Sequence, residues 1–224
     1  MKTLAALFSL ILVFAQLPLL FGSSQEEKTG EAENPSMVKG WWMVSYFAVS
    51  PTQYSRVGKD LIKAESLATR SSLFKEVSDE EKGFPILSWR WKISNVVRSA
   101  IETRKDRNDA AARVIVVFGK EKGYWMLEGM EPRGLKIEYI WASRTPVGQI
   151  FNHPAEKFRK VFVLESGEKK ANQWVYEERN IRNDYSTAFG TGSAEPVAIG
   201  IETDTDHSNE MVTAYYSEPI LKRK

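Results

Sequence analysis

The 224-residue sequence lacks cysteine altogether and has only two histidines, His153 and His207. Without cysteine the chain can form no disulfide bond, no catalytic thiolate and no sulfur-ligated zinc site. Two histidines argue against a catalytic triad and against a metal site built from several imidazoles. The G-x-S-x-G, Walker and H-E-x-x-H motifs are also missing. These absences leave ligand binding or carboxylate chemistry as the functions to consider.

An excess of charge of either sign is missing as well. The chain has 31 Lys and Arg against 29 Asp and Glu, a formal net charge of +2. Because a dedicated nucleic-acid-binding domain carries a basic excess, we expect no nucleic acid partner. Nothing in the sequence indicates an oligomeric state.

Long apolar runs are scarce, and the longest of them lies at the start of the chain. Met1-Lys2 supplies a positive charge, residues 4–21 are largely apolar, and Gly22-Ser23-Ser24 follows with small side chains. This order predicts a secretory signal peptide over residues 1–24, cleaved after Ser24. The alternative is a retained membrane anchor, since about 18 apolar residues can just span a bilayer. We therefore expect a periplasmic or secreted protein with no stable membrane span after processing, or a membrane-anchored one without cleavage.

The remaining chain divides into a short polar leader and one domain. Residues 25–36 are charged and poor in apolar side chains, which is typical of a flexible leader. Residues 37–224 have a suitable length for a single domain with a sizeable core. The chain has seven Trp, eight Tyr and eleven Phe to fill that core.

The stretch Pro85–Ile93 alternates strictly between large apolar and polar side chains. Leu87, Trp89, Trp91 and Ile93 share one parity, and Ser88, Arg90 and Lys92 share the other. A period of two predicts a β-strand with one face on the core.

Further β-type runs recur along the chain with turn residues between them. They cover residues 41–49, 54–57, 61–64, 67–77, 113–118, 123–127, 135–141, 158–164, 173–176, 197–202 and 211–216. Residues 58–60 have the composition of a hairpin turn, and we expect the last two runs to pair with each other. Residues 95–108 are the best candidate for a helix or long loop, and residues 177–189 for a short helix. The pattern predicts an all-β, two-sheet antiparallel sandwich of jelly-roll type with one or two short helices.

Arg90 and Lys92 are the first candidates for ligand binding. They lie opposite the apolar face of their strand and need water, carboxylates or an anionic ligand. A planar guanidinium suits carboxylate, phosphate or sulfate groups. The alternative is an ordinary solvent-exposed face.

Asp109 and Arg113 flank three alanines at the head of the most apolar strand. An arginine there needs a carboxylate if it is enclosed, and we expect Asp109 or Asp184 to supply it. The pair is either structural or part of a ligand site.

The segment 179–185 is dense in donors and acceptors, with Arg179, Asp184 and Tyr185 as candidates to line a pocket or to cap a helix. Tyr139 and Trp141 share one parity and predict an aromatic surface on which a sugar ring can stack.

Asp204 and Asp206 follow an apolar strand and are candidate ligands of a structural Ca²⁺. An EF-hand is excluded because the sixth and twelfth positions are Asn209 and Tyr215. The alternative is an Asx-type turn with no metal. No other cofactor is expected.

In order along the chain, several short motifs resemble a bacterial family of unknown function, domain-of-unknown-function family 3047. They are 63–66 (Lys-Ala-Glu-Ser), 88–92 (Ser-Trp-Arg-Trp-Lys), 109–113, 139–141, 178–180, 184–185, 189–190 and 204–206. The resemblance spans about residues 41–221 and implies a bacterial, exported protein without assigning an activity. The family favours Asn or Thr where this chain has His207.

We interpret the chain as a non-catalytic module of the bacterial envelope that binds a glycan or another anionic ligand. The alternative is an enzyme acting on polysaccharide, a hydrolase or lyase using Asp, Arg and Tyr groups in a cleft. Convergence of Asp109, Arg113, Asp184 and Asp204 in one pocket would favour the enzyme. A structural partner in an envelope complex would instead need a large exposed apolar patch.

Overall fold

Short runs of β-branched and aromatic residues form nearly all of the regular structure. The computed structural model describes residues 38–119, 130–190, 192 and 194–224, all within one compact unit, Asn34–Lys224. The predicted signal peptide, the whole of the predicted leader and the predicted strand 123–127 lie outside the described residues. Within the described part, no helix has both the length and the apolar character that a membrane span requires.

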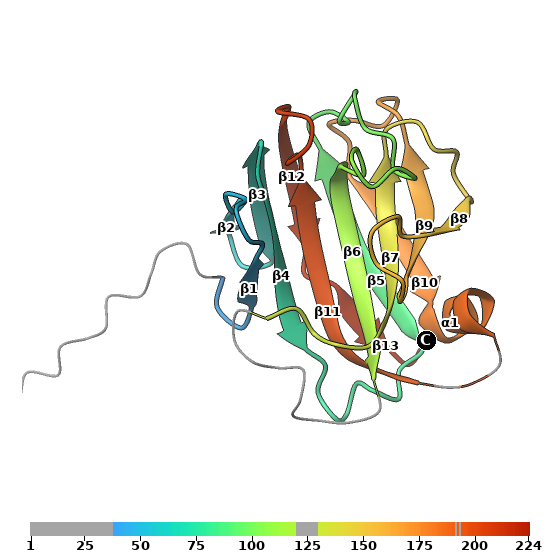
Figure 1. Ribbon diagram of the computed structural model, residues 1–224. Coiled ribbons are helices and arrows are strands. Elements are labelled where there is room, and N and C mark those ends of the chain that lie inside the picture. Colours follow the sequence, from blue (N-terminus) through green and yellow to red (C-terminus); the bar gives the residue numbers. More distant parts are fainter. Residues whose placement is uncertain (1–37, 120–129, 191, 193) are drawn as a thin grey trace, which may run out of the picture. The chain divides into compact units, whose positions relative to one another are not determined.

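One sheet has seven strands, with β11, β6 and β7 side by side near its middle (Figure 1). In spatial order they are β1 (Trp42–Ser45), β4 (Arg70–Glu76), β11 (Glu195–Asp204), β6 (Ala110–Gly119), β7 (Leu135–Ala142), β9 (Arg159–Ser166) and β8 (Ile150–Asn152). Neighbouring strands are antiparallel except β7 and β9, which run parallel.

The second sheet has six strands. In spatial order they are β10 (Val175–Asn180), β5 (Ile86–Ile93), β12 (Met211–Ser217), β3 (Leu61–Leu67) and β2 (Gln53–Val57), while β13 (Ile220–Lys222) pairs with β5. The helix α1 (Ile181–Phe189) follows β10 directly. The side chain of Asn180 starts this helix by accepting hydrogen bonds from the backbone N–H groups of Arg182 and Asn183.

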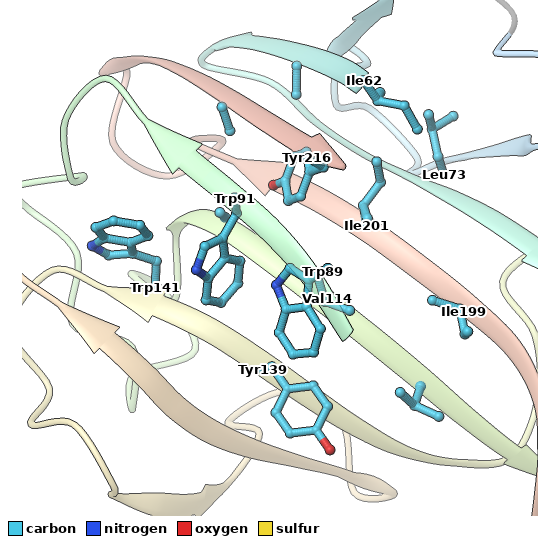
Figure 2. Close-up of a cluster of buried hydrophobic side chains, with 14 of the residues drawn as sticks. Ile62, Leu73, Trp89, Trp91, Val114, Tyr139, Trp141, Ile199, Ile201 and Tyr216 are labelled. Atoms are coloured by element: carbon cyan, nitrogen blue, oxygen red, sulfur yellow. The ribbon is translucent and has the colours of Figure 1, made fainter. Parts of the chain in front are cut away.

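The core lies between the two sheets and is rich in aromatic rings. Trp89 and Trp91 of β5 project into it, with ring centroids 5.5 Å apart at an interplanar angle of 87°. Tyr139 and Trp141 of β7 meet them from the other sheet, at 5.4 Å from Trp89 and 6.0 Å from Trp91 respectively. Figure 2 shows the four rings in one cluster. The alternation predicted for Pro85–Ile93 is confirmed, with Ile93 also fully buried.

These features confirm the predicted fold class, an all-β, two-sheet, mostly antiparallel sandwich of jelly-roll type with a short helix. The hairpin of β2 and β3 is also confirmed.

Residues 95–108, for which the sequence left a helix or a long loop open, form turns and loop. One expectation about the elements is wrong. The strands β11 and β12 do not pair, because the chain crosses from one sheet to the other between them: β11 pairs with β4 and β6, and β12 with β3 and β5.

Candidate functional site

Arg113 lies at the centre of a buried cluster of opposite charges. Successive side chains of β6 point to opposite faces of the seven-stranded sheet, and that of the next residue, Val114, points into the core between the sheets. The Arg113 side chain therefore lies on the outer face of this sheet. Its side chain is 1 % exposed. Nη1 lies 3.0 Å from Glu202 Oε1 and 3.3 Å from Glu138 Oε1, and Nη2 lies 2.9 Å from Asp204 Oδ2. Strand register places Glu202 directly opposite Arg113.

The prediction that a buried carboxylate holds Arg113 is confirmed, but the predicted partners, Asp109 and Asp184, are wrong. Asp109 lies too close in sequence to face Arg113 across the sheet, and Asp184 belongs to the helix α1. The actual partners come from neighbouring strands, where the pleat brings side chains of one face together.

More ion pairs extend this cluster along the same face. They join Arg70 to Glu202, Arg159 to Glu138, Arg159 to Glu156, and Lys136 to Glu131. A cluster of alternating charges allows each buried ion to be compensated, which an isolated buried charge is not.

Burial and the neighbouring arginines shift the pKa values of the two acids on β11 in opposite directions. Burial raises the pKa of Asp204 to about 7, although Arg113 and Arg70 oppose the shift. Burial also acts on Glu202, but there Arg70 and Arg113 outweigh it and hold the pKa below its ordinary range. Both side chains are inaccessible to solvent. Glu202 and Asp204 are therefore closed to a ligand, and their ion pairs with Arg113 join β11 to β6.

Asp109, Asp206 and His207 meet at the beginning of β6. His207 Nδ1 lies 3.1 Å from Asp109 Oδ1 and 2.5 Å from Asp206 Oδ1, and one donor atom from each residue lies within 4.8 Å of the others. These are side chains that can hold a metal ion. Asp204 does not belong to this group, because its Oδ2 faces Arg113 and its Oδ1 accepts a hydrogen bond from the backbone N–H of Asp206. The predicted pair of Asp204 and Asp206 thus forms an Asx-type turn, and Asp206 has other companions.

Arg179, Asp184 and Tyr139 form a separate polar group near α1. The Tyr139 hydroxyl donates to Asp184 Oδ2 at 2.7 Å, and Arg179 Nε donates to the same oxygen at 2.9 Å. Tyr185 is partly buried and packs on Phe118, with ring centroids 4.9 Å apart. These hydrogen bonds link α1 to β7 and β10, so the group has a structural role.

Tyr139 and Trp141 are both buried in the core. They share one face of β7, as predicted, but that face is the one covered by the six-stranded sheet. The indole N–H of Trp141 donates to the backbone carbonyl of Gly167. The expectation that these rings form a surface on which a sugar stacks is therefore wrong.

Arg90 and Lys92 lie on the outer face of the six-stranded sheet beside aromatic rings. The Arg90 guanidinium carbon is 5.4 Å from the ring centroid of Trp174, and Lys92 Nζ is 5.3 Å from it and 4.6 Å from that of Tyr215. Trp174 is 39 % exposed, and Tyr176 nearby is 55 % exposed. We call these five residues the aromatic–cation face.

Strand register explains how this face is assembled. Tyr215 on β12 lies opposite Lys92 on β5, and Tyr176 on β10 lies opposite Arg90. Trp174 immediately precedes β10 and packs against Tyr215, with ring centroids 6.4 Å apart. Residues from three strands therefore form a row that runs across the sheet.

The two cations of the aromatic–cation face have no carboxylate partner within ion-pair distance in the part of the chain that the structure describes. Their neighbours on the same face do: Lys63 pairs with Glu65 at 2.7 Å, and Lys222 with Glu178 at 2.9 Å. Arg90 and Lys92 are thus the cations here that remain available to an external anion.

The four polar residues whose convergence would favour an enzyme do not share a pocket. Asp109, Arg113 and Asp204 lie close together but are buried, and Asp184 lies on the core side of the sheet beside Tyr139. The predicted ligand residues thus do not converge on one site.

Sequence patterns missed Glu138, Arg159 and Glu202 of the buried cluster, and Trp174 of the exposed face. For the first three a signal existed, since each is a charged residue within an apolar strand. Trp174 lies in no run that alternates clearly between apolar and polar residues. Its position beside Arg90 and Lys92 therefore follows only from the strand register.

Comparison with solved structures finds several glycan-active enzymes with a similar fold. The xyloglucanase domain of NopAA, a type three effector from Sinorhizobium fredii solved in complex with cellobiose, has a TM-score of 0.48 at 9 % identity, covering 84 % of this chain and 94 % of that one. A family 12 xyloglucanase from Bacillus licheniformis has a TM-score of 0.42 at 10 % identity, covering 83 % and 87 %. At these identities and TM-scores the likeness carries no argument about activity.

No curated protein matches the sequence. A family model does match, over residues 39–220, which is nearly the whole of the described domain. This agrees with the resemblance seen in the short motifs of the sequence. The chain belongs to the family described as "Protein of unknown function (DUF3047)".

Proposed function

We propose that this protein is a non-catalytic binding module that takes an acidic glycan on its aromatic–cation face. The single observation that carries the proposal is the row of three rings, of which Trp174 and Tyr176 are exposed, beside two cations without carboxylate partners among the described residues. Sugars present an apolar face that stacks on aromatic rings, and acidic sugars add carboxylate or sulfate groups that Arg and Lys bind.

Each component of the face suits one part of such a ligand. Trp174 and Tyr176 are exposed and can be covered by sugar rings. Arg90 offers a planar fork of donors, and Lys92 a mobile ammonium group. A row across several strands fits an extended chain of sugar units better than a single small ion.

The enzyme alternative has less support from the arrangement of the side chains. The acids of the buried cluster are held by arginines, and Asp204 and Glu202 are inaccessible. A hydrolase or lyase needs its carboxylates to reach substrate.

We also propose that the protein works outside the cytoplasm, because residues 1–24 have the order of a signal peptide. N-terminal sequencing of the protein from a periplasmic fraction should begin at Gln25. An intact Met1 on protein recovered from the cytoplasm would contradict this.

Affinity electrophoresis of the purified protein through gels that contain acidic or neutral polysaccharides tests the function. We expect at least one acidic polysaccharide to retard the protein and Trp174→Ala to lose most of that retardation. Phe47→Ala is the matched control, since Phe47 is fully exposed and lies outside the face. Absence of retardation by every acidic polysaccharide, or equal retardation of Trp174→Ala, would contradict the proposal.

A further inference from the structure

A second site, independent of the aromatic–cation face, lies where Asp109, Asp206 and His207 meet. We propose that these three residues bind a first-row divalent metal ion, with Zn²⁺ the best match. Asp109 precedes β6, whereas Asp206 and His207 belong to the turn after β11, so the fold joins residues that are distant in sequence.

Unsatisfied carboxylate oxygens provide the first argument. Asp109 is 0 % exposed, and its Oδ2 has no hydrogen-bond partner among the described residues. Asp206 Oδ1 also lacks a hydrogen bond within the described part of the chain, although it lies 2.5 Å from His207 Nδ1. Carboxylate oxygens that are buried side by side are costly unless a cation lies between them.

The surroundings add to this demand for positive charge. Arg113 is already bound by three other carboxylates and lies on the neighbouring cluster. A metal ion would supply the positive charge that the Asp109 carboxylate does not receive from Arg113.

The distances between donor atoms suit a metal. Two ligands about 2.1 Å from an ion, with an angle of roughly 90–110° between the bonds, lie about 3.0–3.4 Å apart. The 3.1 Å between Asp109 Oδ1 and His207 Nδ1 falls in this interval. The 2.5 Å to Asp206 Oδ1 would lengthen by a small rotation of the half-buried Asp206 side chain.

The donor set selects the kind of metal. An imidazole nitrogen favours Zn²⁺ and its first-row neighbours, whereas Ca²⁺ and Mg²⁺ prefer oxygen ligands throughout. Three protein ligands with an open fourth position are typical of accessible zinc sites. A cavity of about 200 Å³ adjoins the group, lined by Ser99, Ala100, Arg107, Asp109, His207 and Ser208. Water or a small anion can reach the metal from this cavity.

Metal titration of the purified, chelator-treated protein tests the proposal with two readouts. Calorimetry should show one Zn²⁺ per chain, and Co²⁺ should give visible absorption bands when bound. Because the chain has two histidines, NMR can follow each imidazole separately, and the His207 resonances should shift with Zn²⁺ while those of His153 do not. We expect Ca²⁺ to bind at least tenfold more weakly than Zn²⁺.

His207→Gln is the most informative variant, because this side chain is 34 % exposed and its loss should leave the fold intact. We expect it to weaken Zn²⁺ binding at least tenfold, and Asp109→Asn to do the same. Asp60→Asn, an exposed acid in the turn between β2 and β3, should bind Zn²⁺ as the parent does. Failure of the folded parent to bind Zn²⁺, a Ca²⁺ affinity equal to that for Zn²⁺, or unchanged binding by His207→Gln would overturn the proposal. None of these outcomes bears on the glycan proposal.

Discussion

Glu202 and Arg113 face each other across β11 and β6, and the 3.0 Å ion pair between them is fully enclosed. Removing one member of such a pair leaves an uncompensated buried charge, which costs roughly 3–5 kcal/mol. We expect Arg113→Met to lower the free energy of unfolding by about this amount, because Glu138 and Asp204 each lose one of their cationic partners as well. Urea denaturation of the parent and the variant measures the difference.

An exposed ion pair provides the control for this prediction. Arg104 and Asp106 are both exposed and lie 2.7 Å apart. Exposed pairs contribute only about 0–1 kcal/mol, so Arg104→Met should leave the urea midpoint almost unchanged. Equal effects of Arg113→Met and Arg104→Met would show that the buried cluster does not organise the sheet.

Strand alternation explains why the fold class could be predicted from the sequence. Leu87 to Ile93 place every second side chain in the core, and periodicity of this kind is local information. The assignment of strands to sheets is not local, which is why the expected pairing of residues 197–202 with 211–216 is wrong. Their true partners lie far away in the sequence, on β6 and β3.

The same limit applies to the candidate sites. Arg90 and Lys92 were predicted because they share the strand whose alternation is clearest. Trp174 was missed, since only the pairing of β10 with β5 brings it beside them. His207 was not predicted as a ligand because its companion Asp109 lies 98 residues earlier in the chain.

Glu177 predicts a pH dependence of stability. Burial, and then the charge of Glu165, raise the pKa of Glu177 to about 7 in the folded protein, above its ordinary value of 4.5. The folded state therefore binds this proton more tightly than the unfolded state, and stability falls as the pH rises from about 4.5 through 7. Glu177→Gln stays neutral and avoids that loss. Relative to the parent, its free energy of unfolding should gain about 1–2 kcal/mol between pH 5 and pH 8, allowing for partial exposure.

Glu178→Gln is the matched control for this pH effect, because Glu178 points to the opposite face of β10. Its pKa is lowered by hydrogen bonds from Tyr176 and Lys222. Urea titrations at both pH values should therefore show no gain for Glu178→Gln. A gain of the same size in both variants would mean that burial of Glu177 is not its cause.

Gly200 predicts a packing constraint on β11. It lies opposite Phe74 on β4, and a Cβ added at Gly200 would collide with the Phe74 ring. Overpacking of this kind costs about 1–3 kcal/mol, so Gly200→Ala should lower the urea midpoint clearly. Gly83→Ala, where a Cβ would meet no atom within 4 Å, should not.

A second substitution tests whether the Phe74 ring is the obstacle. Phe74→Leu in the Gly200→Ala background removes part of that ring and should recover some of the lost stability. Strictly additive losses in the double variant would place the strain elsewhere.

The affinity of charge-reversed variants for an acidic polysaccharide that retards the parent tests the central claim most directly. Isothermal titration would compare the parent with Arg90→Glu/Lys92→Glu and with Arg104→Glu/Lys157→Glu, which changes the net charge equally at exposed positions outside the aromatic–cation face. We predict at least a tenfold loss of affinity for the first pair, about 1.4 kcal/mol, and less than a twofold loss for the second. Equal losses in the two pairs would show that net charge, and not the aromatic–cation face, governs binding, and would contradict the account.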